Sequence, residues 1–137
     1  MPQAKHGRPA LPKIEIDAEM RQFCSAISAE LHKWDDVSSR KMFGMISFYR
    51  ELPAFPQPRI FACIPDKRAL SSPRAVAFKL VEPRPAQISR MKADSRVTAS
   101  EAPKHLSKWF DFSIHEAGDV NEALWWLEQA YRATRDK

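Results

Sequence analysis

The chain has 137 residues, enough for one domain with a hydrophobic core but short for two. Its 44% hydrophobic and 28% charged residues suit a folded globular domain, and no apolar run approaches the roughly 18 residues that a membrane-spanning helix needs. With no apolar signal-peptide core and only two cysteines, the sequence predicts a cytoplasmic protein without a disulfide framework.

The net charge of +5 is spread unevenly along the chain. Residues 17–63 balance, whereas residues 64–108 carry ten basic and four acidic side chains, and residues 109–137 carry three basic and six acidic. A clustered basic surface is typical of a protein that binds polyanions. The same composition also fits an ordinary solvated surface, so both interpretations stay open.

The first 16 residues are predicted to be a flexible basic arm, followed by a single folded domain over residues 17–137. The arm is rich in proline and basic residues and has almost nothing to bury. A helix is expected from Asp17, whose carboxylate can cap the amides of the first turn. An apolar stripe at helical spacing then predicts the buried side of this helix: Met20, Phe23, Ile27, Leu31 and Trp34.

Three short runs rich in aromatic and β-branched residues predict successive antiparallel strands over residues 40–49, 60–64 and 75–81. Gly44, inside the first run, indicates a bulge or a close backbone approach. A proline-rich loop over residues 52–58 leaves Phe55 as an exposed aromatic.

A short helix is expected over residues 85–93, because Pro85 suits the first helical position. Its inward residues would be Ile88 and Met91. Residues 97–99 are expected to form an edge strand.

The last strand, residues 109–115, alternates between core-facing and solvent-facing side chains. Asp119 through Glu122 then match a capping box for the closing helix. The whole pattern predicts an α+β fold: an antiparallel sheet of four to five strands with N-terminal, short middle and C-terminal helices packed on it.

Chemistry-bearing motifs are scarce. The four histidines lie far apart in sequence and form no metal-ligand pair, and no cysteine or serine has a base beside it. Asp111, Ser113 and His115 share a strand face, an alternation that also arises by chance. Cys24 and Cys63 lie within apolar runs and are expected to be buried, reduced thiols. We therefore expect no catalytic residue, no metal and no cofactor.

The segment Arg40-Lys41-Met42-Phe43-Gly44 resembles the opening motif of the MmcQ/YjbR-like and TfoX N-terminal-like domains. Later landmarks are similar to the same superfamily, and together they cover about residues 17–134: residues 60–63, 76–80, 104–109 and 126–131. The resemblance implies a small YjbR/CyaY-like α+β domain with a loose association with DNA. It carries over no catalytic residue, and the long proline-rich loop departs from the tight turn usual in the family.

Two functions follow as hypotheses. The first is a non-enzymatic protein-binding or self-associating module, a possible homodimer, whose aromatic anchors are Trp125, Phe55 and Trp109. Trp125 lies on the opposite side of the closing helix from the apolar stripe, so we expect it in a contact between two copies or under the N-terminal arm.

The alternative is weak, sequence-independent DNA binding through phosphate contacts. The basic residues in this hypothesis all fall within residues 84–108: Arg84, Arg90, Lys92, Arg96, Lys104 and Lys108. A third, lesser possibility is a small-ligand or enzymatic pocket on the strand face that carries Lys79, Asp111 and His115.

Overall fold

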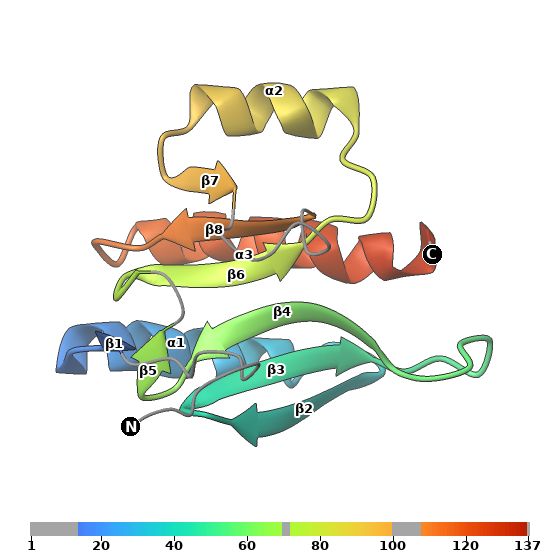
Figure 1. Cartoon of the computed structure of the whole chain (residues 1–137), viewed down its shortest axis with the longest axis horizontal. Coiled ribbons are helices and arrows are strands. Elements are labelled where there is room, and N and C mark those ends of the chain that lie inside the picture. The colour runs from blue at the N-terminus through green and yellow to red at the C-terminus, as the bar shows by residue number, and fades with distance from the viewer. Residues whose placement is uncertain (1–13, 70–71, 100–107, 137) are drawn as a thin grey trace, which may run out of the picture.

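A computed structural model describes residues 14–69, 72–99 and 108–136 (Figure 1). Helices and strands follow in the order β1 (Ile14–Glu15), α1 (Ala18–Leu31), β2 (Val37–Met42), β3 (Met45–Arg50), β4 (Arg59–Pro65), β5 (Arg68–Ala69), β6 (Ala75–Lys79), α2 (Pro85–Ala93), β7 (Val97–Ala99), β8 (Trp109–Ser113), α3 (Asp119–Ala133) and the 3-10 turn η2 (Thr134–Asp136).

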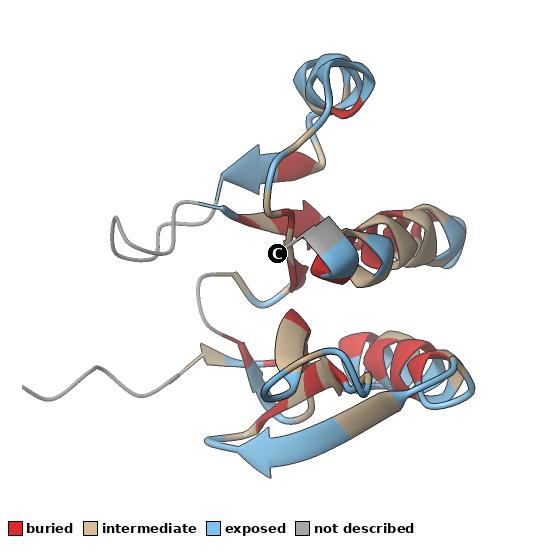
Figure 2. Ribbon diagram, turned by 90° about the vertical axis from the view of Figure 1, so that its right-hand side faces the viewer, coloured by how far each residue is buried: buried red, intermediate tan, exposed pale blue. Residues whose placement is uncertain are grey.

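The fold is α+β, as the sequence pattern predicts. Six antiparallel strands form the main sheet in the order β2-β3-β4-β6-β8-β7, and β1 pairs with β5 in a separate two-stranded sheet. Helices α1 and α3 lie on one side of the main sheet, and α2 stands at its end beside β7 (Figure 2). The expected number of four to five strands is therefore too low.

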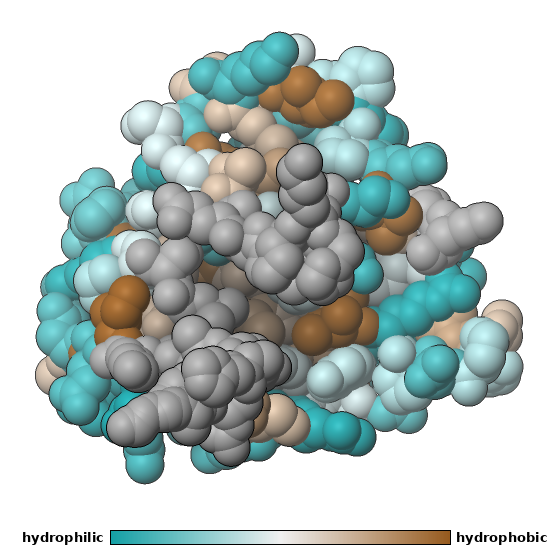
Figure 3. Space-filling model, in the orientation of Figure 1, coloured by the Kyte–Doolittle hydropathy of each residue, from teal (hydrophilic) through white to brown (hydrophobic). Residues whose placement is uncertain are grey.

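The core lies between the sheet and the helices α1 and α3. Phe48, Phe78 and Phe112 are fully buried, each on a different strand. From α3, Trp126 is also fully buried and stacks on Phe78 with ring centroids 5.3 Å apart. On the face of the molecule that Figure 3 shows, the hydrophobic residues of the described part of the chain form separate patches rather than one continuous surface.

The run over residues 40–49 is not one strand. It is a hairpin, in which β2 and β3 pair from Val37–Arg50 to Met42–Met45 and leave Phe43 and Gly44 as a two-residue turn. Both turn residues have positive φ, 57° and 83°, which is the sign pattern of a type I′ turn. A Cβ on Gly44 would lie 3.0 Å from Arg68 Cγ, which confirms the close approach expected at this glycine.

The short helix α2 has the expected bounds but only part of the expected inward face. Ile88 is 41% exposed, whereas Gln87 is buried. The amide of Gln87 donates to Gln129 of α3 at 2.9 Å, and its oxygen accepts from Arg84 N at 2.8 Å. This polar contact with α3 takes the inward place that the spacing assigns to Ile88. Met91, the other predicted inward residue, is half-buried and packs against the core, as expected.

Asp119 and Glu122 do not form a capping box. The cap residue of α3 is Gly118, and neither acid bonds there as such a motif requires. Asp119 Oδ2 instead accepts from the backbone amides of His115 and Glu116, at 2.9 and 3.3 Å. This carboxylate therefore ties the start of α3 to the loop after β8.

The folded domain begins earlier than Asp17. Ile14 and Glu15 form β1, and Ile16 is 5% exposed and belongs to the core. The last three residues of the expected arm are thus held by pairing and burial. The other residues of that arm, 1–13, lie outside the described part.

Candidate functional site

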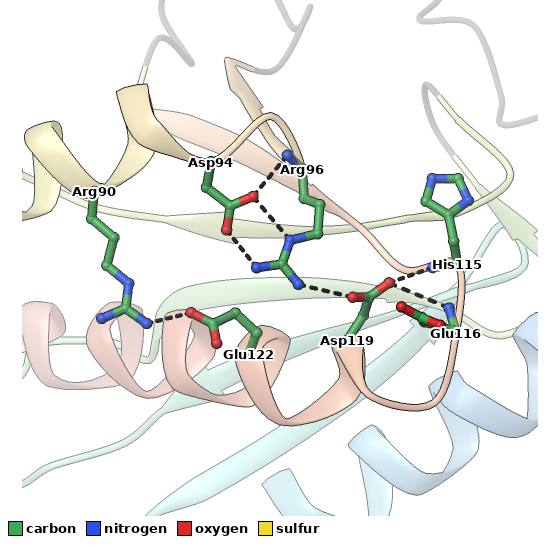
Figure 4. Close-up of polar contacts among 7 residues, drawn as sticks. All are labelled: Arg90, Asp94, Arg96, His115, Glu116, Asp119 and Glu122. Carbon is green, nitrogen blue, oxygen red and sulfur yellow. Dashed lines mark hydrogen bonds and ion pairs between the residues drawn. The ribbon is translucent and has the colours of Figure 1, made fainter.

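The predicted basic segment meets acidic partners where α2 and β7 approach the start of α3 (Figure 4). Arg96 donates through Nε and Nη2 to the two oxygens of Asp94, at 2.9 and 2.7 Å. Its Nη1 donates to Asp119 Oδ1 at 2.8 Å. On α2, Arg90 donates to Glu122 of α3. Two cations of the segment are thus engaged inside the molecule.

The electrostatics of this cluster favour its charged state. The hydrogen bond from the Arg96 side chain lowers the pKa of Asp94 below its usual range. Burial raises the pKa of Asp119. The hydrogen bonds from the His115 and Glu116 amides and from the Arg96 guanidinium lower this pKa by more, so the net shift is downward. In turn, the hydrogen bond to Asp94 raises the pKa of Arg96. We therefore assign the cluster a structural role, which is to dock the α2–β7 segment on α3.

The remaining members of the predicted DNA-binding set do not belong to this cluster of ion pairs. Arg84, Lys92 and Lys108 are exposed, and Lys104 lies outside the described residues. Lys108 O accepts from Leu80 N at 3.0 Å, which places Lys108 beside the end of β6 rather than on α2. Arg90 and Arg96 are thus less available to a phosphate than the sequence predicts, and binding of DNA by the set stays a prediction.

The three predicted aromatic anchors have different environments. Trp109 is only 9% exposed, because it lies in β8 between two paired strands, so it is wrong as an exposed anchor. Phe55 is half-buried beneath the guanidinium of Arg59, 3.9 Å from its ring centroid. Trp125 is also half-buried, and the guanidinium of Arg90 lies 3.7 Å from its ring centroid. Arg90 therefore covers Trp125 in part, a contact that the sequence pattern does not show.

A groove of about 530 Å³ runs between the end of α1 and the outer side of α3. Its apolar and aromatic lining comes from Trp34, Leu124, Trp125 and Tyr131. The rings of Trp34 and Tyr131 lie 5.1 Å apart, and the Tyr131 hydroxyl donates to Asp35 O at 2.8 Å. These contacts join the two helices and fix one wall of the groove.

The polar lining of this α1–α3 groove is acidic. It contains the carboxylates of Glu30, Asp35 and Glu128 and one cation, Lys33. Lys33 approaches Glu30 at 3.7 Å, and Glu128 accepts from Arg132 at 2.7 Å. Asp35 is exposed next to the aromatic wall. Aromatic surface beside net negative charge suits a partner that is both apolar and cationic. The sequence pattern assigns Trp34 and Tyr131 to the core, since spacing alone does not show that both line an opening.

A second hollow, of about 780 Å³, lies between the proline-rich loop and the end of α3. Arg59, Lys79 and Arg135 line it, and none of its described lining residues is acidic. Arg59 Nη1 donates to Thr134 O at 2.6 Å, and Arg50 Nη1 donates to Tyr131 O at 3.1 Å. Both arginines satisfy carbonyls at the C-terminal end of a helix, where positive charge is favourable. We call this hollow the basic cleft.

The strand face with Asp111 and His115 is less open than the sequence predicts. Asp111 is 8% exposed within β8, while His115 is exposed beyond the strand's end. Lys79, opposite Trp109 in the register, lines the basic cleft instead. A common pocket for these three residues stays a prediction.

The two cysteines are free. Burial, assisted by the Asp66 carboxylate, raises the pKa of Cys24 to about 12. Burial also raises the pKa of Cys63, and a contact of 3.3 Å between its Sγ and Ser47 Oγ offsets part of that shift. Both thiols are therefore poor nucleophiles at neutral pH.

Comparison with known proteins gives no match to a family model, a curated protein or a solved structure. In the described part of the chain, no helix is long and apolar enough to cross a membrane. The same residues contain no cluster of three or more His, Cys, Asp or Glu side chains placed to hold a metal ion.

Proposed function

We propose that this protein is a small, non-enzymatic interaction module that binds a protein segment in the α1–α3 groove. The observation that supports it is the pairing of Trp34, Trp125 and Tyr131 with an acidic rim in one hollow. The proposal agrees with the likeness of residues 40–44 to the MmcQ/YjbR-like domains, which we retain as a proposed relationship.

The groove has the features of an interaction hot spot. Tryptophan and tyrosine are enriched among residues whose truncation weakens binding most, because they bury a large area at a low cost in conformational entropy. Around them, Glu30 and Glu128 are ion-paired with Lys33 and Arg132, so the exposed Asp35 contributes most of the negative charge that the rim offers to a partner. The expected partner segment carries an aromatic or aliphatic side chain next to lysine or arginine.

Two synthetic peptides test this proposal by calorimetric titration. One alternates lysine with phenylalanine, and the other has glutamate in place of lysine. We expect the lysine peptide to bind and the glutamate peptide to bind at least tenfold more weakly, because like charges across an interface are unfavourable (about 1.4 kcal/mol per tenfold). Equal binding of the two peptides would contradict the proposal.

Variants locate the binding. Trp125→Ala should lower the affinity for the lysine peptide by about 30-fold, a loss of about 2 kcal/mol of binding free energy that is typical of an aromatic hot spot. Asp35→Asn should lower the dependence of affinity on salt. Glu15→Gln, which removes an exposed carboxylate on β1 outside the groove, is the matched control and should change neither quantity.

A second candidate is weak contact with nucleic-acid phosphates, and the observation that favours it is the basic cleft. Lys79 and Arg135 line this cleft, and none of its described lining residues is acidic. Binding of this kind is independent of sequence and falls steeply with salt. A labelled duplex titrated at two salt concentrations tests it, with Lys79→Gln and Arg135→Gln expected to reduce both the affinity and the salt slope. Unchanged slopes would exclude the cleft as the contact.

A further inference from the structure

The tip of the β2–β3 hairpin has an unusual residue in a demanding position. Its first turn residue, Phe43, has φ of 57°, a left-handed conformation that favours asparagine, aspartate or glycine and costs an ordinary side chain roughly 1–2 kcal/mol. Burial does not compensate this cost, because Phe43 is 56% exposed. Strain held at an exposed aromatic side chain points to a contact outside the protomer.

The tip is also held in place. Gly44 O accepts from three successive amides, those of Asp66, Lys67 and Arg68, at 3.0, 2.8 and 3.0 Å. The aliphatic stem of Arg68 lies over Gly44, within 3.3 Å of where a Cβ would stand. Phe43 is therefore presented on a fixed turn, so little conformational entropy is lost when it binds.

The chemistry around Phe43 is apolar and cationic. Met42 beside it is 50% exposed, and the exposed neighbours in sequence are Arg40 and Lys41. Across the turn, Lys67 and Arg68 are exposed as well, and the Asp66 carboxylate lies 3.9 Å from Lys41 Nζ. This combination matches the partner that the α1–α3 groove is proposed to take.

We propose that the hairpin tip of one copy inserts into the α1–α3 groove of a second copy. The inference rests on the proposed function of the groove and names its occupant. Phe43 and Met42 would pack against Trp34, Trp125 and Tyr131, and the tip's cations would face Glu30, Asp35 and Glu128. The groove's volume of about 530 Å³ is in the range of pockets that hold small ligands, and it exceeds the space that the two side chains of Phe43 and Met42 need.

The contact joins two different surfaces, so it is heterologous. Trp34 and Asp35 of the groove stand just before β2 begins, whereas the tip follows the end of β2, so the length of this strand separates the tip from the groove of its own protomer. Each copy thus offers one tip and one groove. Association by this contact forms a two-fold dimer where both tips insert reciprocally, and a closed ring or an open chain where each pair of copies shares a single contact.

Sedimentation velocity over a range of concentrations tests the inference. The wild-type protein should form assemblies that grow with concentration. Phe43→Asn should weaken them by about 30-fold, and it should also raise the thermal midpoint, because asparagine before glycine suits a type I′ turn. Ile88→Asn removes another exposed large apolar side chain and is the matched control, with assembly unchanged. Wild-type-like assembly of Phe43→Asn would overturn the inference.

Mixing two variants gives the decisive result. Phe43→Asn keeps an intact groove and Trp125→Ala keeps an intact tip, so each alone should stay monomeric and the mixture should stop at heterodimers. Asp35→Lys serves as a second groove variant if Trp125→Ala does not fold. A mixture that stays monomeric would refute tip-in-groove contact.

The lysine–phenylalanine peptide separates the two proposals. If Phe43→Asn still binds this peptide while no variant mixture associates, the groove functions as proposed and the self-association inference fails. If Phe43→Asn does not bind the peptide, the proposed function fails first.

Discussion

The two edges of the main sheet differ in how strongly their basic side chains are paired with acids. At the β7 edge, Arg90 and Arg96 bond to acids of the loop after α2 and of α3. At the β2 edge, Arg40 and Lys41 are exposed next to Phe43. Yet the β7 edge belongs to the most basic part of the sequence, and the β2 edge belongs to a part with no net charge.

The charge counted along a segment of the chain is therefore not the charge that the segment exposes on the surface. The acids of α3 that engage Arg90 and Arg96 come from residues 109–137, the acidic end of the chain. Asp119 and Glu122 stand in the first turn of α3, where the helix dipole favours negative charge. Two ion pairs therefore join the basic and acidic blocks of the sequence across a tertiary contact and offset part of the basic excess.

The largest expected effect comes from Asp119→Ala. This carboxylate is 7% exposed and accepts from Arg96 and two backbone amides, so its removal leaves donors without their acceptor. We expect the free energy of unfolding to fall by about 2–3 kcal/mol, measured by urea denaturation. Glu116→Ala, which removes an exposed acid in the loop after β8, is the control and should cost less than about 0.5 kcal/mol. Equal effects of the two variants would show that the cluster does not dock α2–β7.

Acidification should weaken the same edge. The folded-state pKa values of Asp94 and Asp119 lie below their unfolded values, so the cluster's contribution is complete above the unfolded pKa of about 3.9 and is lost as the pH falls through the lower, folded pKa values. Between pH 5 and pH 3, the wild-type protein should lose more stability than an Asp94→Asn/Asp119→Asn variant. Parallel losses in both proteins would mean that the cluster does not cause the acid sensitivity.

The two edges also differ in how well their structure can be predicted from the sequence. The bounds of α2 and β7 agree with prediction because Pro85 and the short β-branched run after Arg96 act locally. The sequence pattern does not reveal the hairpin at Phe43, because its turn carries phenylalanine where asparagine is usual and the apolar run continues through it unbroken. Local rules fail here at a residue whose side chain is more than half exposed.

The candidate site was predictable only in part. Helical phase alone distinguishes Trp125 from the buried stripe, but the guanidinium above it comes from Arg90, which lies 35 positions earlier in the chain. Tyr131 lies on the apolar stripe of α3, as expected, whereas Trp34 stands in the turn after α1, which ends at Leu31 and not beyond Trp34. Their shared groove depends on how α1 and α3 pack side by side. Spacing within one helix carries no information about the distance to another.

A smaller effect is expected at the hairpin edge from Gly44→Ala. The φ of 83° disfavours any side chain, and the new Cβ would lie 3.0 Å from Arg68 Cγ. A cost of about 1–2 kcal/mol follows from the left-handed backbone, since the flexible stem of Arg68 can move aside. Gly118→Ala is the matched control, because a Cβ there meets nothing within 4 Å and φ is −63°. Thermal unfolding of both variants measures the difference, and equal midpoints would contradict the positive φ at Gly44.

The smallest effect tests whether the outer part of the β7 edge contributes to stability at all. Arg90 contacts Glu122 through an ion pair and Trp125 through its ring, but the Arg90 and Glu122 side chains are 43% and 30% exposed. Exposed ion pairs contribute about 0.2–1 kcal/mol, and an exposed cation over an aromatic ring about 0.5–1 kcal/mol. We therefore expect Arg90→Gln to cost about 1 kcal/mol, with part of that cost reduced by added salt. A double-mutant cycle with Glu122→Gln should give a coupling below about 1 kcal/mol, and Lys92→Gln on the same helix should cost almost nothing. A coupling free energy as large as the loss of stability in Asp119→Ala would mean that the Arg90 ion pair, and not the buried Asp119 carboxylate, is the main stabilising contact at this edge.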